Sequence, residues 1–265
     1  MKSPSLFSLA GKRILVTGAA GHIGKALCER LLEAGAVVYA VDKNSEELAL
    51  WRKGITSGSE RLSDFSADLA DENERVALVR EVTAKTDRLD GAVFAAAFVG
   101  TSDLEGWAVD FAEQSIATWR DALELNLTAP FHLSQLLSPA LRAGVNPSIV
   151  NVGSIYGSLG PNWSLYEGLG MSNPAAYAAS KGGLLQLTRW LTSTLGPQVR
   201  VNSVSPGGIA RHQPGDFDAR YSANVPLGRM ARESDIVGPI SFLLSSAAAY
   251  VTGQDIVVDG GYSVI

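Results

Sequence analysis

The chain has 265 residues, of which 46% are hydrophobic, and 22 basic and 27 acidic residues give it a net charge of −5. This length allows a large buried core and suits one α/β domain or two small ones. No basic block stands out, so we expect no nucleic-acid partner. The single cysteine, Cys28, excludes an internal disulfide and fits a reducing compartment. Without an apolar run typical of a signal peptide or a membrane span, we expect a cytoplasmic protein with no membrane partner.

Short β-rich runs alternate with helical stretches along the chain. The pattern predicts strands over residues 13–17, 37–41, 62–67, 92–97, 148–152, 199–204 and 255–259. It predicts helices over residues 22–34, 71–86, 118–141, 174–195 and 235–245, with a kink at Pro130. Strands that lack polar alternation and are separated by helices indicate a parallel sheet covered on both faces. We therefore expect one α/β domain over residues 1–265, with a doubly wound parallel sheet of about seven strands.

A glycine-rich segment, TGAAGHIG, joins the first predicted strand to the first predicted helix. Its glycines are Gly18, Gly21 and Gly24. Backbone amides at a helix N-terminus can face a diphosphate, and only glycine lets the phosphates come close. The second predicted strand leads into an acid, Asp42, 18 residues after Gly24. This combination favours a Rossmann-type dinucleotide site over an accidental turn.

The acid at the end of the second strand bears on the choice of cofactor. We expect Asp42 to bind the adenosine ribose hydroxyls and to repel the additional phosphate of NADP. The neighbouring Lys43 could pair with that phosphate, but the carboxylate at the strand end is better fixed. The sequence therefore favours NAD over NADP. For Asp42 taken alone, a solvated acid at a strand end remains an alternative.

A second motif, PAAYAASKGG, places a phenol and an ammonium one helical turn apart. Tyr177 and Lys181 share one helix face, and we expect Asn173 to cap that helix and Pro174 to lie in its first turn. Ser154 follows another predicted strand, and open parallel sheets bind ligands at the carboxyl ends of their strands. For the motif alone, an ordinary surface pair remains an alternative.

Over nearly its whole length the sequence resembles the short-chain dehydrogenase/reductase family. The matching segments are TGAAGHIG, ADLAD, LELNLTAPF, VNVGS, YAASK, VRVNSVSPGGI and YVTGQDIVVDGGY. The resemblance implies an NAD(P)-dependent oxidoreductase that acts on CH–OH groups of a small-molecule substrate. It also implies a homo-tetramer or a dimer. No His/Cys cluster has the spacing of metal ligands, so we expect no metal.

The resemblance implies catalytic roles for four residues. Tyr177 would be the general acid/base, Lys181 would favour its ionisation and hold the nicotinamide ribose, and Ser154 would orient the substrate oxygen. Asn126 would anchor a water that connects Lys181 to solvent. An ammonium about 4 Å from the phenol could lower its pKa by at most about three units at an effective dielectric of about 20, and burial opposes this.

Further cofactor contacts follow from the same resemblance, with Asp68 and Leu69 beside the adenine and Ile209 at the nicotinamide amide. The full set is Gly18, Gly21, His22, Ile23, Gly24, Asp42, Lys43, Asp68, Leu69, Ala95, Ala96, Tyr177, Lys181, Pro206, Gly207 and Ile209.

Three positions depart from the family pattern. His22 stands where single-domain members usually have glycine, and this glycine spacing looks more like that of nucleotide-sugar enzymes. The segment FAAA, at residues 94–97, lacks the polar contacts of the family's Asn-Asn-Ala-Gly element. Arg211 replaces a threonine that often contacts the carboxamide.

Two glycine-rich segments, 158–173 and 207–228, are expected to close over the nicotinamide as irregular loops. The first lengthens the interval between Ser154 and Tyr177 and resembles a subgroup of flagellar-glycan and sialic-acid-like sugar pathways. Aromatic and cationic side chains in these segments suit a sugar ring and a carboxylate or phosphate, although packing between the loops is an equal alternative. They are Trp163, Tyr166, Arg211, His212 and Arg220.

Three functions remain open from the sequence. The first is an oxidoreductase for a polar, carbohydrate-like, anionic hydroxy or keto substrate. The second is a nucleotide-sugar epimerase or dehydratase, although those enzymes usually carry a substantial C-terminal substrate domain. The third is a non-catalytic dinucleotide sensor, which would have no use for the four catalytic residue types together. We rank the three in this order.

Overall fold

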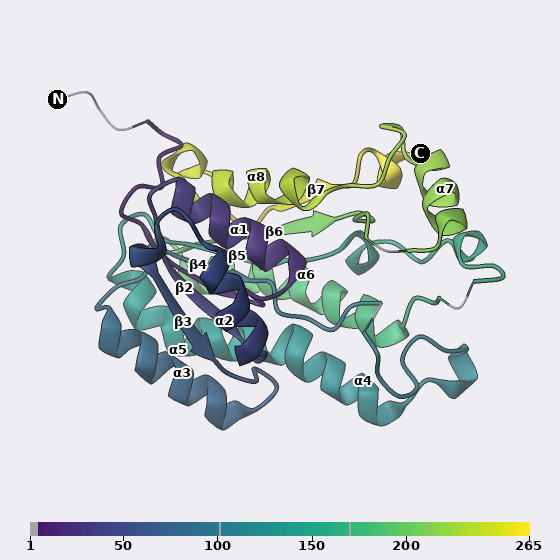
Figure 1. The fold of residues 1–265 in the computed structure, drawn as a ribbon, viewed down its shortest axis with the longest axis horizontal. Coiled ribbons are helices and arrows are strands. Elements are labelled where there is room, and N and C mark those ends of the chain that lie inside the picture. The colour runs from purple at the N-terminus through teal and green to yellow at the C-terminus, as the bar shows by residue number, and fades with distance from the viewer. Residues whose placement is uncertain (1–4, 101, 170, 212) are drawn as a thin grey trace.

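The computed structural model describes residues 5–100, 102–169, 171–211 and 213–265. Within these residues seven parallel strands form one sheet in the order β3-β2-β1-β4-β5-β6-β7 (Figure 1). The strands are β1 (Arg13–Thr17), β2 (Val37–Asp42), β3 (Leu62–Ser66), β4 (Gly91–Phe94), β5 (Ser148–Val152), β6 (Arg200–Pro206) and β7 (Asp255–Val258). The predicted fold class is confirmed.

Helices cover both faces of the sheet because successive strand residues point to opposite sides. Ile14 and Val16 pack in one core with α1 (His22–Glu33), α2 (Ser45–Gly54) and α8 (Glu233–Leu244). Leu15 packs in the other core with the helices on the opposite face (Figure 1). These are α3 (Glu72–Lys85), α5 (Ala129–Arg142) and α6 (Ala175–Leu195).

The predicted helix over residues 118–141 is interrupted in the structure. It comprises α4 (Ile116–Leu123), a π-helical turn at Glu124–Thr128, and α5. Pro130 is the second residue of α5, which follows the π-helical turn directly, and it has no N–H to continue the hydrogen-bond ladder of this continuous helical run. The irregular segment thus lies just before the proline, and the expected kink at Pro130 stays a prediction.

Four local expectations also differ from the structure. Helix α2 was not predicted, and the strand expected over 92–97 ends at Phe94. Pro174 is itself the N-cap of α6, so Asn173 does not cap this helix. The stretch 207–228, expected to be irregular, contains helix α7 (Gly215–Ala223). Among the described helices, none is both long and apolar enough to cross a membrane.

Candidate active site

The glycine loop between β1 and α1 approaches its neighbours too closely for side chains. Gly18 has a left-handed φ of +69°, and a Cβ there would lie 2.8 Å from the backbone nitrogen of Ala96. A Cβ on Gly24 would collide with the carbonyl of Gly18. Helix α1 has no side-chain cap and no acid in its first turn. Its N-terminal amides and partial positive charge therefore suit a phosphate group.

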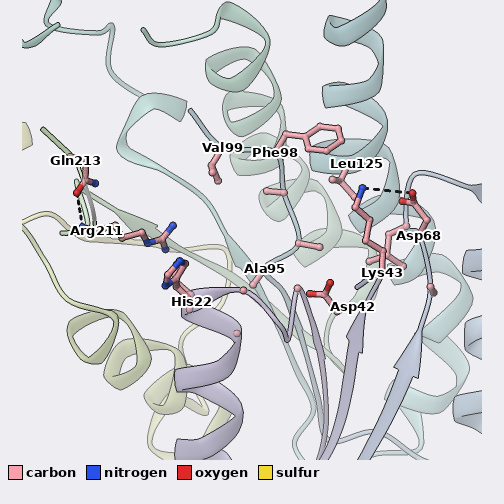
Figure 2. A pocket seen from close by; sticks show the side chains of 18 of the residues that line it. His22, Asp42, Lys43, Asp68, Ala95, Phe98, Val99, Leu125, Arg211 and Gln213 are labelled. Carbon is pink, nitrogen blue, oxygen red and sulfur yellow. Dashed lines mark hydrogen bonds and ion pairs between the residues drawn. The ribbon is translucent and has the colours of Figure 1, made fainter. Parts of the chain in front are cut away.

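Beside this loop a cavity of about 780 Å³, here called the nucleotide cavity, follows the carboxyl edge of the sheet (Figure 2). Its volume is within the range of ligand sites. The expected cofactor residues that line it are Gly18, Gly21, His22, Ile23, Gly24, Asp42, Lys43, Asp68, Leu69, Ala95 and Ala96. The glycine cradle and the acid at its far end fit a dinucleotide.

Asp42 and Lys43 face different partners at the end of this cavity. The Asp42 carboxylate accepts hydrogen bonds from the backbone N–H groups of Ala20 and Asn44, each at 3.0 Å. Lys43 Nζ lies 3.9 Å from Asp68 Oδ2 and 5.6 Å from the ring centroid of Phe98 (Figure 2). The ammonium is thus directed toward Asp68, and the carboxylate of Asp42 is held by the glycine loop and by its own turn.

A second cavity of about 210 Å³, here called the catalytic cavity, adjoins the first. Both cavities are lined by Ile23, Ala95, Ala97, Val99, Met171, Arg211 and Gln213. The second is lined by residues from three motifs that are distant in the sequence. They are Ser154 after β5, Tyr177 and Lys181 on α6, and Pro206, Gly207 and Ile209 at the end of β6.

The phenol and the ammonium of α6 have shifted pKa values. Burial raises the pKa of Tyr177, while a hydrogen bond with Ser154 and the charge of Arg211 oppose that rise. Burial lowers the pKa of Lys181 to about 8. Lys181 Nζ donates to the carbonyl of Val152 at 2.8 Å and lies 5.9 Å from the Tyr177 ring centroid. Burial is thus the larger effect on the phenol, and it opposes ionisation as the sequence argument allowed.

Asn126 lies in the π-helical turn and is fully buried. Its Oδ1 accepts from Phe98 N at 2.8 Å, and its Nδ2 donates to Phe98 O and to Ser180 Oγ, each at 3.1 Å. Nearby, Thr17 Oγ1 accepts from the backbone N–H groups of Ala95 and Ala96, at 3.1 and 3.3 Å. Side chains from other elements thus supply the hydrogen bonds that FAAA itself lacks. The proposed water at Asn126 stays a prediction.

Arg211 lies where the two cavities meet. Its Nε is 3.4 Å from Glu233 Oε1, and His22 Nδ1 lies 4.0 Å from the same oxygen. In Figure 2, His22 and Arg211 lie together at one end of the nucleotide cavity, and Asp42 lies toward the other. His22 is therefore near the glycine loop, as expected. His212, also expected at the substrate, lies outside the described residues.

The two loop segments pack on each other through aromatic rings. Tyr166 lines the catalytic cavity, and its ring lies 5.5 Å from that of Phe217 on α7. Trp163 is 54% exposed, its ring is tilted against that of Tyr166 with centroids 5.9 Å apart, and it lines neither cavity, so direct contact with a substrate is not supported. Arg220 donates to the carbonyl of Glu167 at 2.7 Å. Its side chain therefore packs one loop segment on the other, which is the alternative to a contact with the substrate.

An aromatic stack continues from α7 to the C-terminal turn. The rings of Phe217 and Tyr221 lie 6.0 Å apart, and those of Tyr221 and Tyr262 lie 4.9 Å apart and nearly parallel. The Tyr221 hydroxyl accepts from Gly208 N at 2.6 Å. A side chain at Gly208 would meet the Tyr221 ring at 2.7 Å, so only glycine permits this close approach.

Sequence reasoning missed several residues of the catalytic cavity. Tyr156, Asn173, Gln213 and Phe217 line it and were given no role in ligand binding. Tyr156 follows Ser154 by two residues, and this closeness in the sequence indicates that it lies at the same cavity. Gln213 becomes part of the wall because its amide bonds back to the carbonyl of Ile209 at 2.7 Å. No group of three metal-ligating side chains occurs in the described part of the chain.

Residues 18–263 match the family model described as "Enoyl-(Acyl carrier protein) reductase". The chain is 30% identical to a cis-4-hydroxycyclohexanecarboxylate dehydrogenase of Sinomonas cyclohexanicum, covering 97% of this chain and 99% of that one. It is 32% identical to a galactitol 2-dehydrogenase (L-tagatose-forming) of Cereibacter sphaeroides, covering 98% of each.

Among solved structures, a short-chain dehydrogenase from Leptospira borgpetersenii with bound NAD+ is similar, with a TM-score of 0.87 and 29% identity. The similarity covers 100% of this chain and 97% of that one. The fold and the whole-length matches define an oxidoreductase of alcohols and ketones that uses a nicotinamide cofactor. The chain belongs to the short-chain dehydrogenase/reductase family.

Proposed function

We propose that this protein is an NAD-dependent oxidoreductase that interconverts a secondary alcohol and a ketone in a polar, carbohydrate-like substrate. The observation that carries this proposal is the meeting of Ser154, Tyr177 and Lys181 in one cavity. That cavity adjoins a larger one lined by the glycine loop and by Asp42. A proton-transfer group thus lies beside a site shaped for a dinucleotide.

The proposed mechanism assigns a task to each side chain. Bound nicotinamide supplies or accepts the hydride. In reduction, the protonated phenol of Tyr177 gives its proton to the substrate oxygen, and in oxidation it takes that proton back. The Ser154 hydroxyl orients the same oxygen. Lys181, held by the carbonyl of Val152, places a positive charge beside the phenol and holds the nicotinamide ribose.

Asp42 and Lys43 support NAD as the preferred cofactor, with NADP less favoured. The carboxylate of Asp42 is fixed by two backbone N–H groups at the end of β2. The Lys43 ammonium is drawn to Asp68, which reduces its attraction for an added phosphate. Ile209 and Pro206 line the side assigned to the nicotinamide, and Leu69 lines the side assigned to the adenine.

Arg211 supports an anionic substrate. Among the described residues that line the catalytic cavity, Arg211 and Lys181 are the cationic ones and none is acidic, and Glu233, which pairs with Arg211 Nε at 3.4 Å, is not part of that lining. The relatives include an enzyme named for a cyclic hydroxy acid and one named for a polyol. An acyl thioester, suggested by the description of the family model, is the rival substrate class. An epimerase or dehydratase and a non-catalytic sensor rank below these.

Turnover of a substrate panel tests this proposal. Sugar acids, sugar phosphates, nucleotide sugars, polyols, acyl thioesters and steroids are each assayed with NAD(H) and NADP(H) by the absorbance of the reduced cofactor. We expect the highest kcat/KM with a sugar acid or polyol and NAD. Arg211→Ala should raise KM for carboxylate substrates about tenfold or more and leave neutral polyols nearly unchanged. Arg211→Lys should recover part of the loss.

Results of two kinds would contradict separate parts of the proposal. Highest activity with acyl thioesters or steroids would exclude the carbohydrate-like class. An unchanged KM for carboxylates in Arg211→Ala would exclude the anionic feature alone.

We also propose one domain with 158–173 and 207–228 as its substrate segments, assembled as a homo-tetramer or a dimer. Light scattering on the eluted protein measures the assembly.

A further inference from the structure

The wall of the catalytic cavity carries a pair of phenols that the proposed mechanism does not use. The Tyr156 and Tyr166 hydroxyl oxygens lie 3.0 Å apart, and both residues line the cavity. Burial raises the pKa of Tyr156, so its hydroxyl stays protonated and can donate. In such a pair one hydroxyl donates to the other, which leaves one O–H proton and several lone pairs for a further group.

A second, independent observation concerns Asn173 in the same cavity. The residue is 6% exposed and lines the cavity, and its Oδ1 is buried with no hydrogen-bond partner among the described residues. An unpaired buried carbonyl oxygen costs about 1–3 kcal/mol, so a site of this kind calls for an explanation. Rotation of the side chain toward the cavity that the residue lines would let a donor on a bound ligand satisfy this oxygen.

Both features depend on the long interval between Ser154 and Tyr177. Tyr166 and Asn173 belong to segment 158–173, and Tyr156 precedes it by two residues. The backbone N–H of Tyr156 donates to Ser154 Oγ at 3.2 Å, which ties this wall to the proposed catalytic serine. The Tyr166 ring rests against Phe217, which fixes its position. Tyr156 and the segment thus supply O–H groups and an acceptor to the wall of the cavity that Ser154 also lines.

From these contacts we infer that Tyr156, Tyr166 and Asn173 form a second oxygen subsite, which binds a hydroxyl group next to the reacting carbon. The inference rests on the proposed function and narrows its substrate to polyhydroxylated compounds. A hydroxyl both donates and accepts, so it can donate to Asn173 Oδ1 while it accepts from the phenol pair. A monohydric alcohol leaves these groups unpaired, and such a site rejects it.

Matched pairs of alcohols test the subsite. We would compare 4-hydroxycyclohexanecarboxylate with 3,4-dihydroxycyclohexanecarboxylate, and cyclohexanol with 1,2-cyclohexanediol, using all stereoisomers and both cofactors. For the wild type we expect kcat/KM to be at least about tenfold higher for the best dihydroxy compound of a pair. The Tyr156→Phe/Tyr166→Phe double variant and Asn173→Ala should each lose most of this preference through KM, while monohydroxy compounds change less than about twofold.

Tyr250→Phe removes a fully exposed phenol and is the matched control, for which we expect no change. NADH affinity, measured by fluorescence, should be the same in all variants, because none of the three residues lines the nucleotide cavity. Equal kcat/KM within each pair, or equal losses for both members in the variants, would overturn the subsite and leave the oxidoreductase intact. No turnover of any alcohol or ketone with either cofactor would overturn the proposed function itself.

Discussion

The side chain of Asn126 forms two hydrogen bonds with the backbone of Phe98, at 2.8 and 3.1 Å. This closed pair joins the π-helical turn to the segment that follows β4. It replaces contacts that the alanines at 95–97 cannot make. Phe98 and Leu125 both line the nucleotide cavity, so the bond pair also sets the spacing of that wall.

Asn126→Ala should therefore lower the free energy of unfolding by about 3 kcal/mol, because it leaves buried backbone groups of Phe98 and the hydroxyl of Ser180 without a partner. Urea unfolding measures this change. Asn224→Ala, which removes an amide bond on the exposed end of α7, is the control and should cost less than about 1 kcal/mol. Equal losses in both variants would contradict the assigned role.

The acid at the end of β2 should decide cofactor preference. Wild-type protein should bind NADH more tightly than NADPH. Asp42→Ser should weaken NADH binding about tenfold, and it should make the affinities for NADH and NADPH more nearly equal. Lys43→Ala should change the preference little, because its ammonium faces Asp68. Fluorescence titration with both reduced cofactors is the measurement. A wild-type preference for NADPH would show that Lys43 outweighs the carboxylate.

Tyr177→Phe should lower kcat by about 10² to 10⁴, since only the proton donor is lost. NADH affinity should remain close to that of the wild type. Burial raises the pKa of Tyr177, so the phenol is protonated near neutral pH and ketone reduction should proceed there. Alcohol oxidation needs the ionised phenol and should become faster as pH rises. A Tyr177→Phe variant with wild-type kcat is incompatible with this mechanism.

The charge of Arg211 lowers the pKa of Tyr177. Removing it in Arg211→Ala should move the acidic limb of the oxidation profile to higher pH, when a neutral alcohol is the substrate. Arg189→Ala, at an exposed position of α6, should leave the limb in place. Profiles of kcat/KM against pH provide the comparison, and a shift toward lower pH would have the wrong sign.

The buried charge of Lys181 should lower the free energy of unfolding, although the residue is needed for turnover. Its pKa falls from 10.5 in the unfolded chain to about 8 in the folded protein, so burial of the charged form opposes folding below pH 8. The opposition diminishes as pH rises from 8 toward 10.5, where the folded lysine is neutral and the unfolded one is still charged. Lys181→Met should therefore abolish turnover yet stabilise the protein by about 2 kcal/mol near neutral pH.

Urea unfolding at several pH values measures this gain, which should shrink above pH 8. The control is Lys53→Met on the exposed face of α2, with an expected change below about 0.5 kcal/mol. If Lys181→Met destabilised the protein at every pH, then the bond to Val152 O would outweigh the cost of burial.

The sequence predicted the sheet well because its strands leave local patterns, and it located the glycine loop from the same kind of signal. Uninterrupted apolar strands and a glycine loop followed by an acid are readable without knowledge of tertiary contacts. Helix α2 is short, and its clearest local signal is the cap formed by Asn44, which accepts from Glu47 N. The π-helical turn before Pro130 has no sequence signal of its own, apart from the proline that follows it.

The rest of the site depends on contacts between distant residues. The hydrogen bonds from Ala95 and Ala96 to Thr17 cross from β4 to β1, and three alanines give no hint of them. Likewise, the pKa of Tyr177 follows from how deeply it is buried, whereas spacing indicated only its distance from Lys181. The pairing of Tyr156 with Tyr166 depends on how segment 158–173 folds back onto the cavity.

The stacked ring of Tyr262 makes the end of the chain part of the support of the catalytic cavity. Tyr262 holds Tyr221, and Tyr221 holds the backbone of Gly208 beside the cavity wall. Tyr262→Ala removes the outer ring of this stack, so we expect it to raise KM in a protein that still folds. Substrate affinity thus depends in part on a side chain that lines neither cavity.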